Sequence, residues 1–144
     1  MASDPNSKER DKLVRDQPVG IPAEQGPLAP YHGAQPPAPQ WFTDAVATPY
    51  ETHFVECEGV QIHYQAWGDR AKPGLLLVHG NGAHAHWWDF VAPYLLEDYF
   101  VVAMTFSGMG DSGWRPDYTM DVFAREQLAV CEHAGLFAHA EKPI

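Results

Sequence analysis

Cysteine is scarce in this chain of 144 residues, which has only Cys57 and Cys131. Two cysteines so far apart in sequence cannot form a disulfide scaffold, so we interpret both as reduced thiols. Basic residues are also few, since nine Lys and Arg face 19 Asp and Glu and leave a net charge of −10. A chain this acidic repels a phosphate backbone, which argues against a nucleic-acid partner.

Long hydrophobic runs are absent as well. The longest strongly apolar runs are residues 75–78 and 99–104, whereas a membrane-spanning helix needs about 20 such residues. Residues 1–13 are polar and charged and lack the apolar core of a signal peptide. The sequence therefore predicts no membrane partner and a cytoplasmic location.

Composition changes near residue 40. Residues 1–40 hold eight of the 13 prolines and few apolar residues. Such a segment buries too little apolar surface to offset the entropy lost on ordering. We predict a disordered, proline-rich arm over residues 1–40, a tail rather than a docking arm, followed by one domain over residues 41–144.

The domain begins with strand patterns. Residues 53–57 and 60–67 are rich in β-forming side chains and are separated by Glu58-Gly59, a hairpin signal. Apolar and polar residues alternate over 60–65, which is typical of a half-buried antiparallel strand. Residues 75–78 and 99–105 are instead continuously apolar, which favours strands buried on both faces, as in a parallel sheet.

Two helices are expected among these strands, over residues 86–96 and 119–134. Thr119 is a suitable N-cap for the second helix, and Gly135 a suitable stop. The spacing of this helix predicts one buried apolar stripe, made of Met120, Ala124, Leu128, Cys131 and Gly135. The order of elements, β-β-β-α-β-α, predicts an α/β sheet with flanking helices.

The first motif, Val78-His79-Gly80-Asn81-Gly82, directly follows a predicted buried strand. Its glycines allow a sharp turn at the carboxyl end of the strand, where ligands bind in open α/β sheets. Backbone N–H groups of such a turn can stabilise a developing oxyanion. The motif alone leaves two interpretations open, an oxyanion-binding turn and a tight turn without chemistry.

The second motif, residues 108–113, matches G-x-G-x-x-G after a strand. A dinucleotide site needs a helix that begins within the glycines, and Pro116 delays the next helix, so we disfavour that interpretation. The same stretch also contains Gly110-Asp-Ser112-Gly, but Trp114 stands where the nucleophile elbow G-x-S-x-G requires glycine.

Histidines form the third motif, with His79, His84 and His86 close in sequence and Asp89 nearby. A zinc site needs three or four protein ligands, and no cysteine or second cluster supplies the rest. We therefore predict no metal site and interpret these histidines as loop and helix-start residues.

Taken together, residues 50–144 resemble the N-terminal portion of the α/β-hydrolase fold family. The resemblance rests on the hairpin that ends at Trp67-Gly68, on residues 75–80 with Trp88 after them, and on residues 99–103 with residues 107–112 after them. The order and spacing of these pieces are much more specific than any one of them.

The resemblance implies roles for particular residues. The backbone N–H of Asn81, or of Gly82 as second choice, is the expected oxyanion-hole donor. In the family the loop after strand 4 commonly reads Asp-x-x-Gly-x-Gly-x-Ser and is largely structural; here Thr105 stands in place of the Asp. The residues expected to shape these loops are His79, Gly80, Gly108, Gly110 and Ser112.

The family's nucleophile follows strand 5, and its acid and histidine come later still. This chain ends where strand 5 would begin, and it contains no G-x-S-x-G. The resemblance thus implies a hydrolase of ester, epoxide, carbon–halogen or carbon–carbon bonds in small molecules, without a cofactor. No nucleophile is assigned, its type (Ser, Asp or Cys) stays open, and we predict that this chain alone is inactive.

Two alternatives remain at this point. One is a binding module that uses the surface of a half-sheet, and the other is a small nucleotide-binding domain. We also expect self-association through the apolar strand Leu75–Val78, because no charge or proline blocks its pairing with another strand.

Overall fold

A computed structural model describes residues 26, 29–32 and 34–138. The chain divides into two units, residues 1–38 and 39–144. Within the first unit a short 3₁₀ helix, η2, spans Ala29–Tyr31. Most of the predicted disordered arm lies outside the described residues. In the second unit, helix α2 spans Gln40–Val46.

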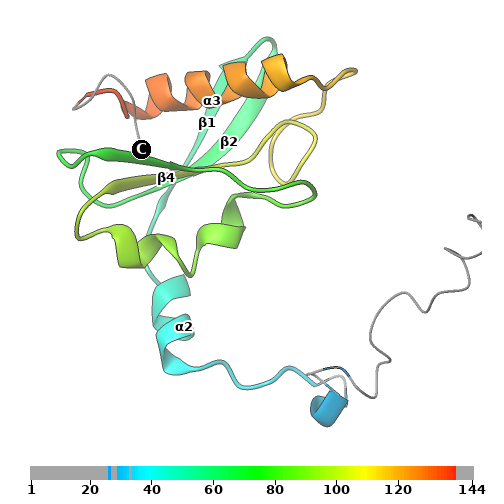
Figure 1. The fold of residues 1–144 in the computed structure, drawn as a ribbon, viewed down its shortest axis with the longest axis vertical. Coiled ribbons are helices and arrows are strands. Elements are labelled where there is room, and N and C mark those ends of the chain that lie inside the picture. Colours follow the sequence, from blue (N-terminus) through cyan, green and yellow to red (C-terminus); the bar gives the residue numbers. More distant parts are fainter. Residues whose placement is uncertain (1–25, 27–28, 33, 139–144) are drawn as a thin grey trace, which may run out of the picture. The chain divides into compact units, whose positions relative to one another are not determined.

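The core of the second unit is a mixed sheet of four strands (Figure 1). Their order across the sheet is β1-β2-β4-β3. β1 pairs antiparallel with β2, and β2 with β4, while β3 runs parallel to β4. The strands are β1 Glu51–Cys57, β2 Val60–Trp67, β3 Gly74–Leu77 and β4 Phe100–Met104.

The predicted hairpin between β1 and β2 is confirmed. Cys57 pairs with Val60, so the loop contains only Glu58 and Gly59. Both have positive φ, 53° and 78°, as a type I′ turn requires. This local geometry fixes the register of the two strands and places the Glu58 Oε1 2.6 Å from the Nε of Arg125.

The prediction that β2 is half-buried is wrong. Its expected polar face is covered as fully as its apolar face, since His63 is 2% exposed and Gln65 0% exposed. The segment after β3 covers this face: the ring of His86 stacks near that of His63 and contacts the side chain of Gln65. Alternation along one strand reveals its two faces but not what distant segments place on them.

The single helix expected over residues 86–96 is also wrong. The structure has two short 3₁₀ helices instead, η3 (Ala85–Trp88) and η4 (Ala92–Leu95). Pro93 lies near the start of η4. Proline has no N–H and its ring clashes with the carbonyl of the preceding turn, so a continuous α-helix through this position is disfavoured.

The second helix was predicted almost to the residue, as α3 spans Met120–Ala134. The Thr119 Oγ1 accepts a hydrogen bond of 3.2 Å from the N–H of Val122, and Gly135 ends the helix with φ of 78°. The expected apolar stripe is wrong, however, because Met120 is 80% and Leu128 54% exposed. Of the stripe residues only Cys131 is buried, and it shares the buried face with Glu126, Val130 and Ala134.

Two layers cover the sheet. Helix α3 lies on one face, and η3 and η4 lie on the other (Figure 1). Beneath α3 the core includes Ile62, Tyr64 and Val102. Beneath η3 and η4 it is built around Trp67 and Val101. β4 is therefore the most enclosed strand, with covered residues on both faces and a neighbouring strand on each side.

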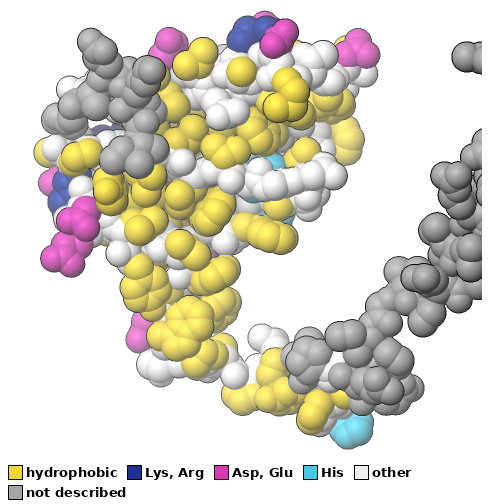
Figure 2. All heavy atoms as spheres, viewed as in Figure 1, with side chains coloured by type: hydrophobic (Ala, Val, Ile, Leu, Met, Phe, Trp, Pro, Cys, Tyr) yellow, Lys and Arg dark blue, Asp and Glu magenta, His cyan; other side chains and the backbone are white. Residues whose placement is uncertain are grey.

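Apolar surface remains exposed on the second unit. Hydrophobic side chains gather over α2 (Figure 2), where the Phe42 ring packs against Phe90 and Trp41 is half exposed. Within the described part of the chain, no helix combines the length and apolarity needed to cross a bilayer.

β3 is an edge strand among the described residues. The N–H of Phe100 donates to the carbonyl of Pro73, so residues 73, 75 and 77 direct their backbone groups toward β4. Gly74, Leu76 and Val78 then direct theirs away from the sheet. All of Leu75–Val78 is apolar and only partly buried, which makes this edge a template for a further strand.

We propose that the chain associates at micromolar concentration through this edge. Replacing Leu76 with proline removes an outward N–H, while every bond to β4 stays in place. We expect sedimentation velocity to show less association for Leu76→Pro than for the unchanged chain. Leu75→Pro is the control, since it removes a bond to β4 and should instead lower stability. A concentration-independent monomer for the unchanged chain would refute the proposal.

Candidate functional site

Two loops meet at the carboxyl ends of the parallel strands β3 and β4. The first, residues 78–84, leads from β3 to η3, and the second, residues 105–113, follows β4. Because neighbouring parallel strands end at the same edge of a sheet, these loops lie side by side, as ligand-binding loops do in open α/β sheets.

The turn in the first loop presents free backbone donors. Among the described residues, no protein atom accepts a hydrogen bond from the N–H of Gly80, Asn81 or Gly82. All three residues are exposed. Gly82 has φ of +71°, a conformation that only glycine adopts without strain. The turn therefore offers a short run of N–H groups to an anionic ligand.

The His79 side chain links this turn to the second loop through two hydrogen bonds. Its side chain is buried, and its Nε2 accepts a hydrogen bond of 3.1 Å from the N–H of Phe106, the second residue after β4. Since an amide can only donate, Nε2 carries no proton and Nδ1 carries it. The Nδ1–H then donates to the Gly80 carbonyl at 2.7 Å. A neutral imidazole thus joins the two loops.

The glycines of the second loop permit close packing. A Cβ on Gly108 would lie 2.5 Å from the Tyr118 hydroxyl, and one on Gly110 would lie 2.8 Å from the His84 Cβ. Both glycines also have positive φ. The next described helix, α3, begins only at Met120. The helix that a dinucleotide site needs within these glycines is therefore not present in the described residues.

Ser112 is a structural residue of the same loop. Its hydroxyl donates to the Thr105 carbonyl at 2.6 Å and accepts from the N–H of His63 at 2.9 Å. The side chain is buried, and both bonds tie the end of the loop back to β2 and β4. A hydroxyl held in this way is not available as a nucleophile.

Thr105 links three parts of the structure. Its Oγ1 accepts from the N–H of Ala85 at 3.0 Å and lies 3.2 Å from the His63 Nδ1. The Thr105 hydroxyl can donate its proton to the His63 Nδ1 only while that nitrogen carries no proton. Burial, the largest cause, lowers the pKa of His63 below its ordinary value, and the neighbouring His86 and His84 add to the effect.

The remaining histidines do not form a metal centre. The His86 Nδ1 lies 2.8 Å from the Asp89 Oδ2, and the His84 ring lies 5.5 Å from that of His86. His79 faces away toward Phe106. In the part of the chain that the structure describes, no three His, Cys, Asp or Glu side chains are arranged to hold a metal ion.

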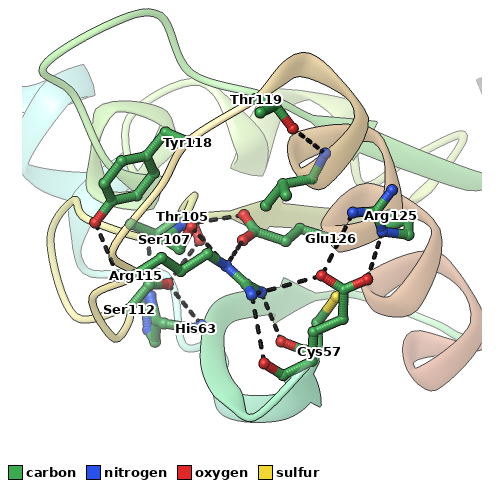
Figure 3. Close-up of polar contacts among 12 residues, drawn as sticks. Cys57, His63, Thr105, Ser107, Ser112, Arg115, Tyr118, Thr119, Arg125 and Glu126 are labelled. Atoms are coloured by element: carbon green, nitrogen blue, oxygen red, sulfur yellow. Dashed lines mark hydrogen bonds and ion pairs between the residues drawn. The ribbon is translucent and has the colours of Figure 1, made fainter.

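A buried ion pair was missed from the sequence. The Arg115 Nε lies 2.8 Å from the Glu126 Oε1, and the two side chains are 7% and 0% exposed (Figure 3). One signal was available, because Glu126 shares a face of α3 with the apolar Val130. A carboxylate at such a position needs a buried partner, although the sequence does not say which cation supplies it.

Comparison with families and curated proteins agrees with this fold. The family model for the alpha/beta hydrolase fold matches residues 73–136. Epoxide hydrolase 3 of Xenopus tropicalis is 26% identical over an alignment of 106 residues that covers 71% of this chain and 29% of that protein. Human epoxide hydrolase 4 is 27% identical over 84 residues, 56% of this chain and 23% of that protein. The chain thus spans less than a third of the length of these relatives.

Comparison with solved structures also agrees with this fold. Epoxide hydrolase A from Mycobacterium thermoresistibile matches with a TM-score of 0.58 and 25% identity, over 66% of this chain and 30% of that one. The thioesterase domain from the curacin biosynthetic pathway matches with a TM-score of 0.56 and 29% identity, over 60% of this chain and 32% of that one. The predicted α/β class, a hairpin followed by parallel strands with flanking helices, is confirmed.

Because Gly110 is closely packed and Gly59 is not, alanine substitution should lower stability more at Gly110 than at Gly59. Both residues have positive φ, but a Cβ on Gly59 would meet nothing within 4 Å. Gly59→Ala should therefore cost only the backbone strain, about 1–2 kcal/mol. Gly110→Ala should cost roughly 1–3 kcal/mol more because of the clash. Denaturant unfolding, followed by tryptophan fluorescence, measures both, and equal losses would contradict the packing described for this loop.

Burial of His63 predicts a loss of stability in acid. Its pKa is lowered in the folded protein, so the unfolded chain binds the proton first as pH falls below about 6.5. Stability supplied by neutral His63 is present above that pH and decreases below it, toward the folded pKa, by at most about 1.4 kcal/mol per pH unit.

The measurement is the free energy of unfolding at several pH values between about 7 and 5. His63→Gln should flatten this dependence, while His32→Gln, a change at an exposed position, should not. An unchanged slope in folded His63→Gln would show that this histidine is not the group responsible.

Proposed function

We propose that this chain, which carries the N-terminal portion of the α/β-hydrolase fold, contributes the oxyanion-binding turn of a hydrolase that acts on small molecules. The Asn81 N–H is the proposed main donor, with the Gly82 N–H as the second. The observation that supports this role is the run of unpaired N–H groups from Gly80 to Gly82 at the carboxyl end of β3.

The physical argument concerns preorganisation. An oxyanion is stabilised most by donors that are already fixed before charge develops, because no energy is then spent on orienting them during the reaction. The bond from His79 to the Gly80 carbonyl fixes one peptide of this turn. The N–H of Ala83 donates to the same carbonyl at 3.3 Å, which closes the turn around Asn81 and Gly82. The free N–H groups are therefore held in place without being used by the protein itself.

The proposed reaction is hydrolysis of an epoxide, an ester or a related bond through a covalent acyl- or alkyl-enzyme. The names of both curated relatives, epoxide hydrolases 3 and 4, favour the epoxide. The chain would supply oxyanion donors, while nucleophile, acid and histidine belong to later parts of the family's fold. No cofactor enters this scheme.

Composition supports two further parts of the proposal, which concern the partner and the compartment. A net charge of −10 disfavours nucleic acid as a partner. The cytoplasm is the proposed compartment, since Cys57 and Cys131 are both free and buried.

We propose that the chain by itself has no turnover, because oxyanion donors without a nucleophile and base provide only a small part of triad catalysis.

The experiment is a chimaera of residues 1–136 with the remaining portion of Mycobacterium thermoresistibile epoxide hydrolase A. We expect turnover of styrene oxide by the chimaera and none by the unextended chain. Asn81→Pro removes the N–H and should lower turnover about 10²–10³-fold. Asn81 is not among the residues with positive φ, so proline is not excluded at this position on that ground.

Asn81→Ala is the matched control, since it keeps the N–H and removes only the side chain. An equal loss in both variants would assign the effect to the side chain. Full turnover in folded Asn81→Pro would remove this amide from the proposed site, and turnover by the unextended chain would overturn its proposed inactivity.

A further inference from the structure

We infer that Glu126, held by Arg115, is a positioning residue for the turn that carries Asn81. The inference rests on the proposed function of that turn. Glu126 lies on α3, on the opposite side of the sheet from η3. It acts through two consecutive backbone amides and one histidine.

The two amides belong to Phe106 and Ser107, the second and third residues after β4. The Phe106 N–H donates to the His79 Nε2 at 3.1 Å, and the Ser107 N–H donates to the Glu126 Oε2 at 3.0 Å. One short segment is therefore held from both sides, by the histidine beneath the turn and by the carboxylate on α3. We call these two bonds, together with the Arg115–Glu126 pair, the clamp.

Arg115 keeps the carboxylate in one orientation. Its Nε donates to the Glu126 Oε1 at 2.8 Å and also contacts the Ser107 Oγ at 3.2 Å. Its Nη2 donates to the Cys57 carbonyl at 2.6 Å, which anchors the guanidinium on the β1–β2 hairpin (Figure 3). Each carboxylate oxygen thus has its own donor, and neither can turn without breaking a charge-assisted bond.

Burial makes this arrangement sensitive to substitution. Glu126 is fully buried, and its carboxylate accepts hydrogen bonds from Arg115 and from the Ser107 amide. Removal of one partner from a buried ion pair is costly, because the other charge is left without compensation. The expected local response is a shift of the Phe106–Ser107 segment, which is bonded directly to both sides.

His79 carries this shift to the turn. The Phe106 N–H determines which ring nitrogen of His79 is protonated, because the other nitrogen must then carry the proton. With the proton on Nδ1, His79 donates to the Gly80 carbonyl. Loss of the Phe106 bond allows the Nε2–H form, in which that donor is absent and the Gly80 carbonyl retains its longer bond, 3.3 Å, from the Ala83 N–H.

The test is made on the full chain and needs no turnover. Glu126→Gln keeps the size of the side chain, but its amide cannot accept from Arg115 and Ser107 through both ends at once. We expect carbethoxylation of His79 by diethyl pyrocarbonate, located by mass spectrometry, to accelerate about tenfold or more, the effect of losing one charged hydrogen bond. His53 and His86 serve as references within the same protein.

The tautomer of His79 distinguishes a positioning role of Glu126 from a purely structural one. Long-range ¹H–¹⁵N spectra of histidine-labelled protein should show Nδ1–H for His79 in the unchanged chain and a mixture with Nε2–H in Glu126→Gln. Glu126→Asp, which keeps the charge, should recover part of the Nδ1–H form. Arg125→Gln is the matched control, because it breaks an exposed ion pair with Glu58 from the same helix, while Glu58 keeps its longer contact with Arg115 at 3.7 Å.

The inference is overturned if folded Glu126→Gln keeps the Nδ1–H form and the reactivity of His79. Should that variant not fold, Arg115→Lys keeps the charge while losing the planar donors, and the same two readouts decide. Failure of Asn81→Pro to affect the chimaera would instead remove the proposed function and leave the clamp intact, so the two failures are distinguishable.

Discussion

The backbone of Thr105–Ser107, where the chain leaves β4, makes the bonds on which the rest of the second unit depends. The Thr105 N–H donates to β2 at the His63 carbonyl, and its own carbonyl accepts from Ser112. The Phe106 and Ser107 amides donate to the loop after β3 and to α3. A buried backbone must satisfy its polar groups, and here the bonds also join the end of β4 to β2, to both loops and to α3.

Local chemistry made part of this fold predictable. The Glu58-Gly59 pair indicated the hairpin, because a two-residue loop restricts which residues can adopt positive φ. Thr119 and Gly135 marked the ends of α3, because a cap and a left-handed stop act within one turn of the helix. In each case the residues that carry the signal are neighbours in sequence, so no knowledge of the tertiary structure was needed.

Long-range contacts account for what was missed. Pattern reading placed His63 on a solvated face, whereas loops from residues 84–86 and 105–112 cover it. The stripe predicted on α3 follows the spacing of apolar residues alone, so it includes exposed Met120 and omits the buried carboxylate of Glu126. Arg115, in the segment that leads into α3, pairs with Glu126 and makes its burial possible, but no local pattern in the sequence indicates this pairing.

The segment after β4 is held by different kinds of bond on the two faces of the sheet. Toward η3, Thr105 stands where the resembled family usually has aspartate, and its neutral hydroxyl meets a His63 whose pKa burial lowers. An aspartate there would favour a charged His63 and require both charges to be desolvated. Toward α3, the full ion pair of Arg115 and Glu126 is used. Neutral bonds toward one face and a satisfied ion pair toward the other therefore hold the same segment, residues 105–107.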